Sequence, residues 1–167
     1  MPHRSSLSVA LTTPTLLMLL TTCQAPPADQ AEMVAATTPA PAVEYFTTPE
    51  TESMGFPFSE AVRVGNMLYL SGHAGNLPDA AAVVEGGIQA ETRQTMENIK
   101  ATLERYGSSM DRIVKCTVMI DDIADWPAMN EVYATYFPGH KPARSAFGAE
   151  GLPLDAAVEI ECWATVG

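Results

Sequence analysis

The chain has 167 residues, which is enough for one folded domain with a tail but hardly for two full domains. Apolar residues make up 47% of it, so a sizeable core can be buried, and the formal net charge is −11. Because no stretch gathers lysine and arginine, the composition argues against nucleic-acid binding and against electrostatic docking on an anionic membrane.

The first 22 residues are predicted to be a signal peptide. Arg4 gives a positive start, and the apolar run over residues 7–20 is too short and too interrupted for a membrane-spanning helix. Leu20-Thr-Thr-Cys23 then resembles the bacterial lipobox, in which the cysteine is lipidated, although Thr22 departs from the usual Gly, Ala or Ser. We therefore expect an exported protein, either periplasmic or anchored to a membrane through lipid on Cys23. An ordinary signal peptide cleaved nearby is the alternative.

Residues 23–54 are predicted to be a flexible linker. Proline, alanine and threonine dominate this stretch and large apolar groups are few, so it cannot bury enough surface to become ordered. The folded domain is expected to cover residues 55–167.

The first half of this domain begins with two strand-like runs, residues 60–64 and 67–71. They are joined by Gly65-Asn66, a pair that tolerates positive φ and is typical of a hairpin turn. A loop is expected over residues 72–87. Apolar residues at helical spacing then predict a helix over residues 88–106.

The second half alternates strands and one helix. Strands are predicted over residues 113–120, 143–148 and 156–166, and a helix over residues 126–137, which Pro138-Gly139 ends. The order β-β-α-β-α-β-β predicts an α+β fold with both helices on one face of a single sheet. The second face then needs a partner, so we expect a homo-oligomer.

Two cysteines lie at apolar positions of the predicted strands, Cys116 and Cys162. They are expected to be buried free cysteines that behave as small hydrophobes, and a disulfide is the alternative in an exported protein. The histidines His3, His73 and His140 are scattered, and neither CxxC nor HExxH occurs. The sequence therefore predicts no metal site.

Arg144 is an isolated cation between apolar segments. It lies in Pro142-Ala-Arg-Ser145, and the next predicted strand carries Glu159 and Glu161. A guanidinium matches a carboxylate through two parallel hydrogen bonds, so Arg144 could hold a small organic acid while an acid/base group acts on it. A structural ion pair is the alternative, and it is the interpretation that these residues alone favour.

A series of segments in this domain occurs in an order and spacing that carry more information than any one of them. They are Asn66-Met-Leu-Tyr-Leu-Ser-Gly72, Ala90-Glu-Thr-Arg-Gln94 with Asn98-Ile-Lys100, Val114-Lys-Cys-Thr-Val118, Asn130-Glu-Val-Tyr133 with Tyr136-Phe-Pro138, Pro142-Ala-Arg-Ser145 and Val158-Glu-Ile-Glu161. Together they resemble the RidA/YjgF family of imine/enamine deaminases over residues 55–167.

The resemblance implies a fold, an assembly and a reaction. The fold would be chorismate-mutase-like α+β, assembled as a homotrimer whose sheets face inward and whose clefts lie at the subunit interfaces. The reaction would be the hydrolysis of reactive 2-imino or 2-enamino acids to 2-oxo acids and ammonia, with no metal or organic cofactor.

The resemblance also assigns residues by position. Arg144 matches the arginine that grips the substrate carboxylate, and Glu159 matches the acid that orients or activates water, whereas Glu161 is left structural. Ser71 and Gly72 would line the cleft.

A second group of cleft positions contains departures from the family pattern. Asn130 matches a cleft asparagine, but many members have Tyr where this chain has Phe58 and Cys where it has Ala146. His73 occupies a position that is often Gln. The carboxylate grip is expected to remain, while substrate preference and rate stay open.

Other functions compete with the deaminase. The same trimer could be a non-catalytic module that binds a small carboxylate or acts as a scaffold, because export would separate it from imino acids made inside cells. A cytoplasmic location, usual for the family, is the alternative to export. Ribonuclease activity, sometimes attached to this family, is disfavoured by the acidic chain and its missing basic groove.

Overall fold

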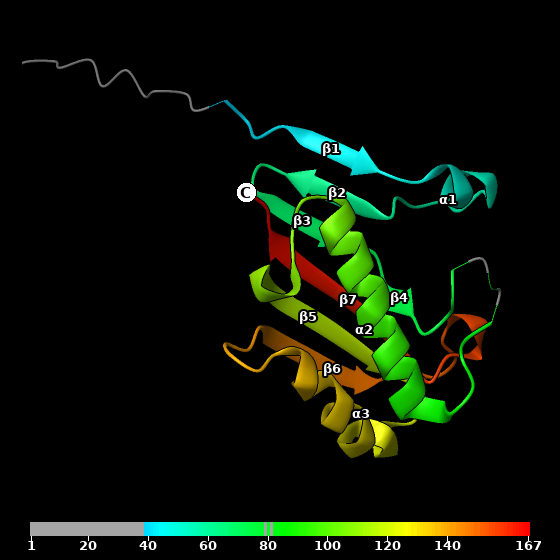
Figure 1. Cartoon of the computed structure of the whole chain (residues 1–167). Coiled ribbons are helices and arrows are strands. Elements are labelled where there is room, and N and C mark those ends of the chain that lie inside the picture. Colours follow the sequence, from blue (N-terminus) through cyan, green and yellow to red (C-terminus); the bar gives the residue numbers. More distant parts are fainter. Residues whose placement is uncertain (1–38, 79, 81) are drawn as a thin grey trace, which may run out of the picture. The chain divides into compact units, whose positions relative to one another are not determined.

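A computed structural model describes residues 39–167 apart from residues 79 and 81 (Figure 1). Within these residues a seven-stranded sheet has the order β1-β2-β3-β7-β5-β6, and β4 also pairs with β7. The described strand pairs are antiparallel except for β5 with β6, which is parallel. The strands are β1 Val43–Phe46, β2 Ala61–Val64, β3 Met67–Leu70, β4 His73–Ala74, β5 Ile113–Ile120, β6 Ala143–Gly148 and β7 Val158–Thr165.

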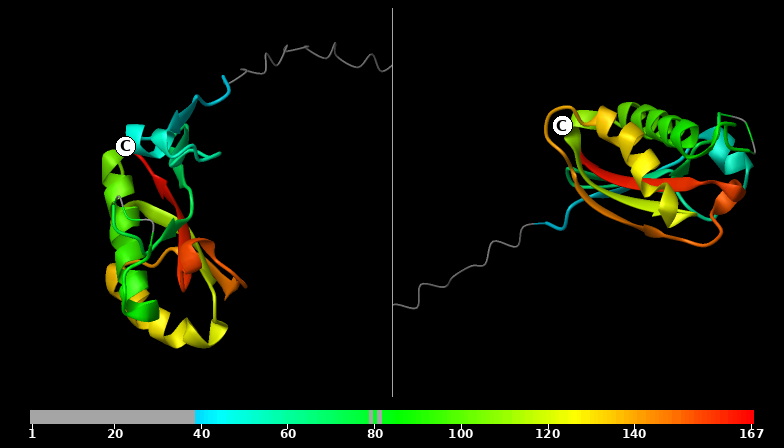
Figure 2. Two further views of the ribbon diagram at one scale, coloured as in Figure 1. Left: turned by 90° about the vertical axis from the view of Figure 1, so that its right-hand side faces the viewer. Right: turned by 90° about the horizontal axis from the view of Figure 1, so that it is seen from below.

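The α-helices of the described chain are α1 Pro49–Ser53, α2 Gly87–Arg105 and α3 Trp126–Tyr133. Figure 2 shows that α2 and α3 cover the same face of the sheet, as the sequence predicts. The buried side chains of α2 recur every three or four residues, which is the spacing of one helical face. They include Thr92, Thr95, Met96, Ile99, Thr102 and Leu103.

Alternation along β7 separates the two faces of the sheet. Val158, Ile160, Cys162 and Ala164 are buried beneath the helices, whereas the intervening side chains point to the opposite face. Aromatic residues lie on that opposite face, where Tyr69 and Trp163 meet edge to face at 5.1 Å between ring centroids. No described helix covers this second face.

The local predictions agree with most elements. Strands β5 and β6 have the predicted bounds, and Gly107, with φ of +81°, follows α2 at the predicted stop. The second helix is shorter than the predicted range of residues 126–137. Helix α3 ends at Tyr133, and the chain continues as 3-10 helix over Ala134–Tyr136. The predicted loop over residues 72–87 contains the short strand β4.

The predicted linker is wrong in its last part. Strand β1 pairs with β2, with Val43 opposite Val64, and α1 follows. An ion pair between Glu44 and Arg63 and the stacking of Phe46 on Tyr106 hold β1 in place. These partners are distant in the sequence, so the local, proline-rich composition of residues 39–54 does not predict them. The compact unit that contains these elements begins at Pro39.

Other predictions for the N-terminal region lie outside the described residues. They are the signal peptide over residues 1–22, the lipidated Cys23 and the first part of the linker. In the part of the chain that the structure covers, no helix combines the length and the apolar character that crossing a membrane requires.

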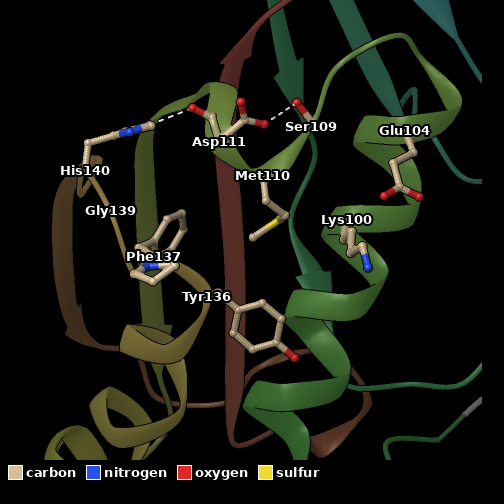
Figure 3. Close-up of a pocket in the computed structure, with 10 residues that line it drawn as sticks. Lys100, Glu104, Ser109, Met110, Asp111, Tyr136, Phe137, Gly139 and His140 are labelled. Carbon is tan, nitrogen blue, oxygen red and sulfur yellow. Dashed lines mark hydrogen bonds between the residues drawn. The ribbon is translucent and has the colours of Figure 1, made fainter.

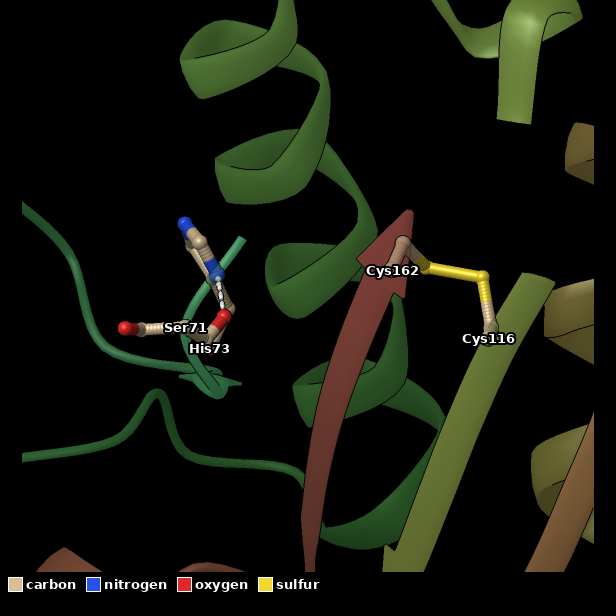
Figure 4. The surroundings of a disulfide bond; sticks show 4 residues. All are labelled: Ser71, His73, Cys116 and Cys162. Atoms are coloured by element: carbon tan, nitrogen blue, oxygen red, sulfur yellow. Dashed lines mark hydrogen bonds between the residues drawn. A yellow bond between two sulfur atoms is a disulfide. The ribbon is translucent and has the colours of Figure 1, made fainter. Parts of the chain in front are cut away.

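The expectation of two free cysteines is also wrong. Cys116 and Cys162 form a disulfide between β5 and β7, with an S–S distance of 2.01 Å (Figure 4). They are register partners in the antiparallel ladder, and their Cα atoms are 4.2 Å apart. Residues directly opposite on one face of a sheet approach closely. This pairing depends on strand register, which the sequence alone does not give.

Candidate active site in two halves

Arg144 lies on β6 and points to the sheet face that α3 covers. Its Nη1 donates a hydrogen bond to Asn130 Oδ1 at 2.6 Å. The guanidinium carbon also lies 5.4 Å from the ring centroid of Trp126 and 4.9 Å from that of Tyr133. All these partners come from α3, so the helix and the edge strand together fix the cation.

The guanidinium of Arg144 has no acidic partner in the described chain. The ion pairs found there join Arg63 to Glu44 and Arg105 to Glu60. The structural ion pair that the sequence left open for Arg144 is therefore not formed within residues 39–167, where described. The bond to Asn130 uses one of its five N–H donors, and no other side-chain hydrogen bond of Arg144 is found within the described residues.

Glu159 lies on β7 and points to the opposite, open face of the sheet. Its carboxylate packs directly against Gly72: a Cβ built on Gly72 would lie 2.7 Å from Glu159 Cδ and closer still to Oε1. Gly72 has no positive φ, so the reason for glycine at this position is space for the carboxylate. Burial raises the pKa of Glu159 above its ordinary value of 4.5, and the neighbouring charge of Glu161 raises it further.

Ser71 joins this second group through the backbone. Its hydroxyl donates to the carbonyl oxygen of Ser59 at 2.7 Å, and its N–H donates to the carbonyl oxygen of Glu60. These bonds hold the end of β3 against the loop that carries Phe58. Phe58 is 54% exposed and stacks on Phe56 with ring centroids 5.1 Å apart. The structure thus brings Ser71, Gly72 and Glu159 together, with Phe58 on the adjoining loop.

The two groups form separate half-sites within one chain. We call Arg144 and Asn130 the clamp half, and Ser71, Gly72 and Glu159 the acid half. The ladder aligns Arg144 with Cys116, whereas Glu159 aligns with Met119. Arg144 and Glu159 are therefore separated by two strand spacings across the sheet, about 10 Å, and by about 10 Å along the strands. Their side chains lie on opposite faces of the sheet.

His73 and Ala146, the other noted positions, are packed structurally. His73 Nδ1 donates to the carbonyl oxygen of Ser71 at 2.9 Å, and its Nε2 lies 3.0 Å from Thr102 Oγ1. Burial lowers the pKa of His73. Ala146 packs against the hydrophobic core.

Two cavities on the described surface have no residue of either half-site in their lining. One of about 410 Å³ lies between α2 and the segment after α3 and is drawn in Figure 3. Its lining includes Lys100, Met110, Phe137 and His140, and none of the predicted site residues. A second, of about 470 Å³, is lined by His73, Thr102, Glu60 and Arg105, which already bond to one another.

Two further residues lie against the guanidinium of the clamp half, Trp126 and Tyr133, and the sequence does not single them out as site residues. The sequence predicts the helix over residues 126–137 that contains both, but it gives neither residue a role beside Arg144. The signal was their spacing from Asn130, because positions 126, 130 and 133 share one helical face.

The fold and these half-sites define a class: a single-sheet α+β protein with an arginine that has no acidic partner in the described chain and a carboxylate of raised pKa on opposite sheet faces. A family model described as Endoribonuclease L-PSP matches residues 50–166. The crystal structure of YyfA from Yersinia pestis, a Rid family protein described as of unknown function, aligns with a TM-score of 0.69 and 39% identity. That alignment covers 75% of this chain and all of the other.

Curated relatives agree with this match. The 2-iminobutanoate/2-iminopropanoate deaminase of Mus musculus is 38% identical over 121 residues, 72% of this chain and 89% of the relative. The chloroplastic Reactive Intermediate Deaminase A of Arabidopsis thaliana is 39% identical over 110 residues, 66% of this chain and 59% of that longer relative. The chain belongs to the RidA/YjgF family.

Proposed function

We propose that this protein hydrolyses reactive 2-imino and 2-enamino acids to 2-oxo acids and ammonia. The observation that carries the proposal is the guanidinium of Arg144, held by α3 and without an acidic partner in the described chain. Such a cation in a protein of net charge −11 supplies the local positive charge that a small carboxylate needs. The names of the mouse and Arabidopsis relatives support the same reaction.

The reaction needs positioning and proton transfer. Arg144 binds the substrate carboxylate and places the iminium carbon for attack by water. Glu159 takes a proton from the water as the C–O bond forms, which gives a tetrahedral amino alcohol. It then returns a proton to the nitrogen, the C–N bond breaks, ammonia leaves, and loss of the hydroxyl proton gives the 2-oxo acid. These steps require no metal or organic cofactor.

The raised pKa of Glu159 suits both proton transfers, from the attacking water to the carboxylate and from the carboxyl group to the leaving nitrogen. A carboxylate whose pKa lies nearer to neutrality accepts a proton from water more readily and still releases it to the leaving nitrogen. The packing of Gly72 against the carboxylate fixes its position.

The complete site is proposed to form between copies of the chain. One copy holds Arg144 and Glu159 on opposite faces of its sheet, so a small substrate cannot reach both. A homotrimer with inward-facing sheets would bury the open aromatic face and bring the clamp half of one subunit to the acid half of the next. The exposed Trp163 and Phe147, 40% and 49% accessible, support an interface on this face.

Export and lipidation are proposed for the N-terminal part. The sequence pattern over residues 1–22 and Cys23 supports a lipoprotein signal, and the Cys116–Cys162 disulfide fits an oxidising compartment. Mass spectrometry of the mature N-terminus tests this: a diacylated or triacylated Cys23 supports the anchor, and an unprocessed Met1 contradicts export.

Two other functions make different predictions. A non-catalytic carboxylate-binding trimer is favoured by Phe58 and Ala146, which lack a hydroxyl and a thiol. A ribonuclease, which the family description names, would need a basic surface, and the chain carries 9 Lys and Arg against 20 Asp and Glu.

The deciding assay mixes the purified protein with a freshly generated 2-imino acid and follows ammonia and 2-oxo acid release. We expect a rate above that in buffer, and loss of this gain in Arg144→Ala. No gain over buffer, with Arg144→Ala behaving as the parent, would contradict the enzyme and leave carboxylate binding to be measured by titration.

A further inference from the structure

One stripe of α3 supplies every described contact to the guanidinium of Arg144. Trp126, Asn130 and Tyr133 stand at i, i+4 and i+7, which places them one above another on a single helical face. Asn130 accepts a hydrogen bond, and the two aromatic rings lie beside the cation at 5.4 and 4.9 Å.

An aromatic ring holds a guanidinium differently from a carboxylate. The negative face of the ring attracts the cation without accepting its N–H groups. A carboxylate partner would instead occupy the donors that a substrate carboxylate needs. The aromatic contacts therefore restrict the side chain of Arg144 while they leave its in-plane donors free.

The two rings differ in how firmly they are built into the core. Tyr133 is buried and packs against Phe137, with ring centroids 4.9 Å apart, and its hydroxyl has no hydrogen-bond partner in the described chain. Burial raises its pKa to about 12, so the ring stays neutral beside the cation. Trp126 is partly exposed, which makes it the position that can change without opening a large cavity.

We propose that Trp126 and Tyr133 are positioning residues that orient Arg144 for the substrate carboxylate, and that Trp126 sets substrate affinity. The proposal rests on the proposed deaminase function. It assigns the aromatic pair no contact with the reacting atoms.

The test compares Trp126→Leu with Trp126→Phe in the full-length protein. Leucine keeps apolar bulk and removes the aromatic face, whereas phenylalanine keeps a face for the cation. We expect Trp126→Leu to raise KM for a 2-imino acid about three- to tenfold, with a smaller change in kcat. Trp126→Phe should restore most of the affinity. The thermal midpoint of each variant is the folding control.

An NMR measurement makes the physical contact visible without catalysis. The Nε–H and Cδ protons of Arg144 should show ring-current shifts in the parent and in Trp126→Phe, and these shifts should shrink in Trp126→Leu. Smaller shifts together with the raised KM support the proposal.

Two results would overturn it. In the first, the shifts shrink but KM stays unchanged. In the second, both variants lose affinity in proportion to their thermal midpoints, which indicates a structural role. A different result would contradict the proposed function itself: the parent protein shows the ring-current shifts but neither turns over an imino acid nor binds a 2-oxo acid. The positioning role, which rests on that function, would then be contradicted as well.

Discussion

Glu159 combines the features expected of an acid/base group: partial burial, an acidic neighbour and a glycine that makes room for it. Its identity as an acid could be read from the sequence, but its surroundings could not. The alternation Val158, Glu159, Ile160 places it on the face opposite the core. The packing of Gly72 against it depends on the three-dimensional path of the chain between β3 and β4.

Replacing Glu159 by Gln should remove proton transfer while keeping size and polarity. We expect kcat to fall by about 10²- to 10⁴-fold. In the parent, activity should rise with pH through the raised pKa of Glu159, and the variant should lack this limb of the profile. A pH–rate profile that keeps the limb in Glu159→Gln would assign it to another group.

The same shift in pKa has a consequence for stability. A carboxyl group whose folded pKa is raised contributes stability that is present below its unfolded pKa, near 4.5, and is lost as pH rises through the folded value. Glu159→Gln should therefore be slightly more stable than the parent at pH 7, and the difference should vanish near pH 4. Urea denaturation at both pH values measures this, and a less stable variant at pH 7 would be the opposite result.

A methyl group at position 72 should disturb the acid half selectively. In Gly72→Ala the new Cβ would overlap the Glu159 carboxylate, so the carboxylate must move. We expect kcat to fall at least about tenfold, because small misplacements of catalytic groups are costly. Gly107→Ala, at a positive φ outside the site, is the matched control, since it should lower stability and spare kcat. An unchanged kcat in Gly72→Ala would mean that the position of Glu159 is not critical.

At the scale of elements, local periodicity and long-range pairing differ in how well they can be predicted. The amphipathic stripe of α2 and the alternation of β5 are local patterns, and their predicted bounds agree closely with the structure. The composition of residues 43–46 predicts a linker, whereas the partners that stabilise strand β1 lie far along the chain, on β2 and at the end of α2. The disulfide likewise depends on the register of β5 against β7.

The disulfide should contribute strongly to the stability of the domain. It links residues separated by 46 positions, and cross-links of this loop length are worth about 2 to 5 kcal/mol. Reduction, or the double change Cys116→Ala with Cys162→Ala, should lower the free energy of unfolding by that amount. The urea midpoint should therefore move to a lower concentration. Thiol titration shows whether each sample is oxidised or reduced. If the oxidised and the reduced protein then unfold at the same urea midpoint, the disulfide does not stabilise the domain.

At the scale of the whole molecule, the resemblance predicts Arg144 and Glu159 in one cleft at a subunit interface, and within one chain the structure places them on opposite faces of the sheet. The sequence could give each residue's identity and each strand's alternation. It could not give the pairing that relates β6 to β7. An active site that uses both residues must therefore be built by more than one copy, in agreement with the uncovered aromatic face of the sheet.

Mixing two inactive variants tests this account most directly. Arg144→Ala supplies an intact Glu159, and Glu159→Gln supplies an intact Arg144. If the site is shared between subunits, the whole population of trimers from equal co-expression should regain about a quarter of the parent activity, the fraction of all interfaces that combine both intact residues under random assembly. Each variant alone should stay inactive. Mixed trimers that form, as shown by native mass spectrometry, but remain as inactive as the separate variants would contradict a site shared between copies.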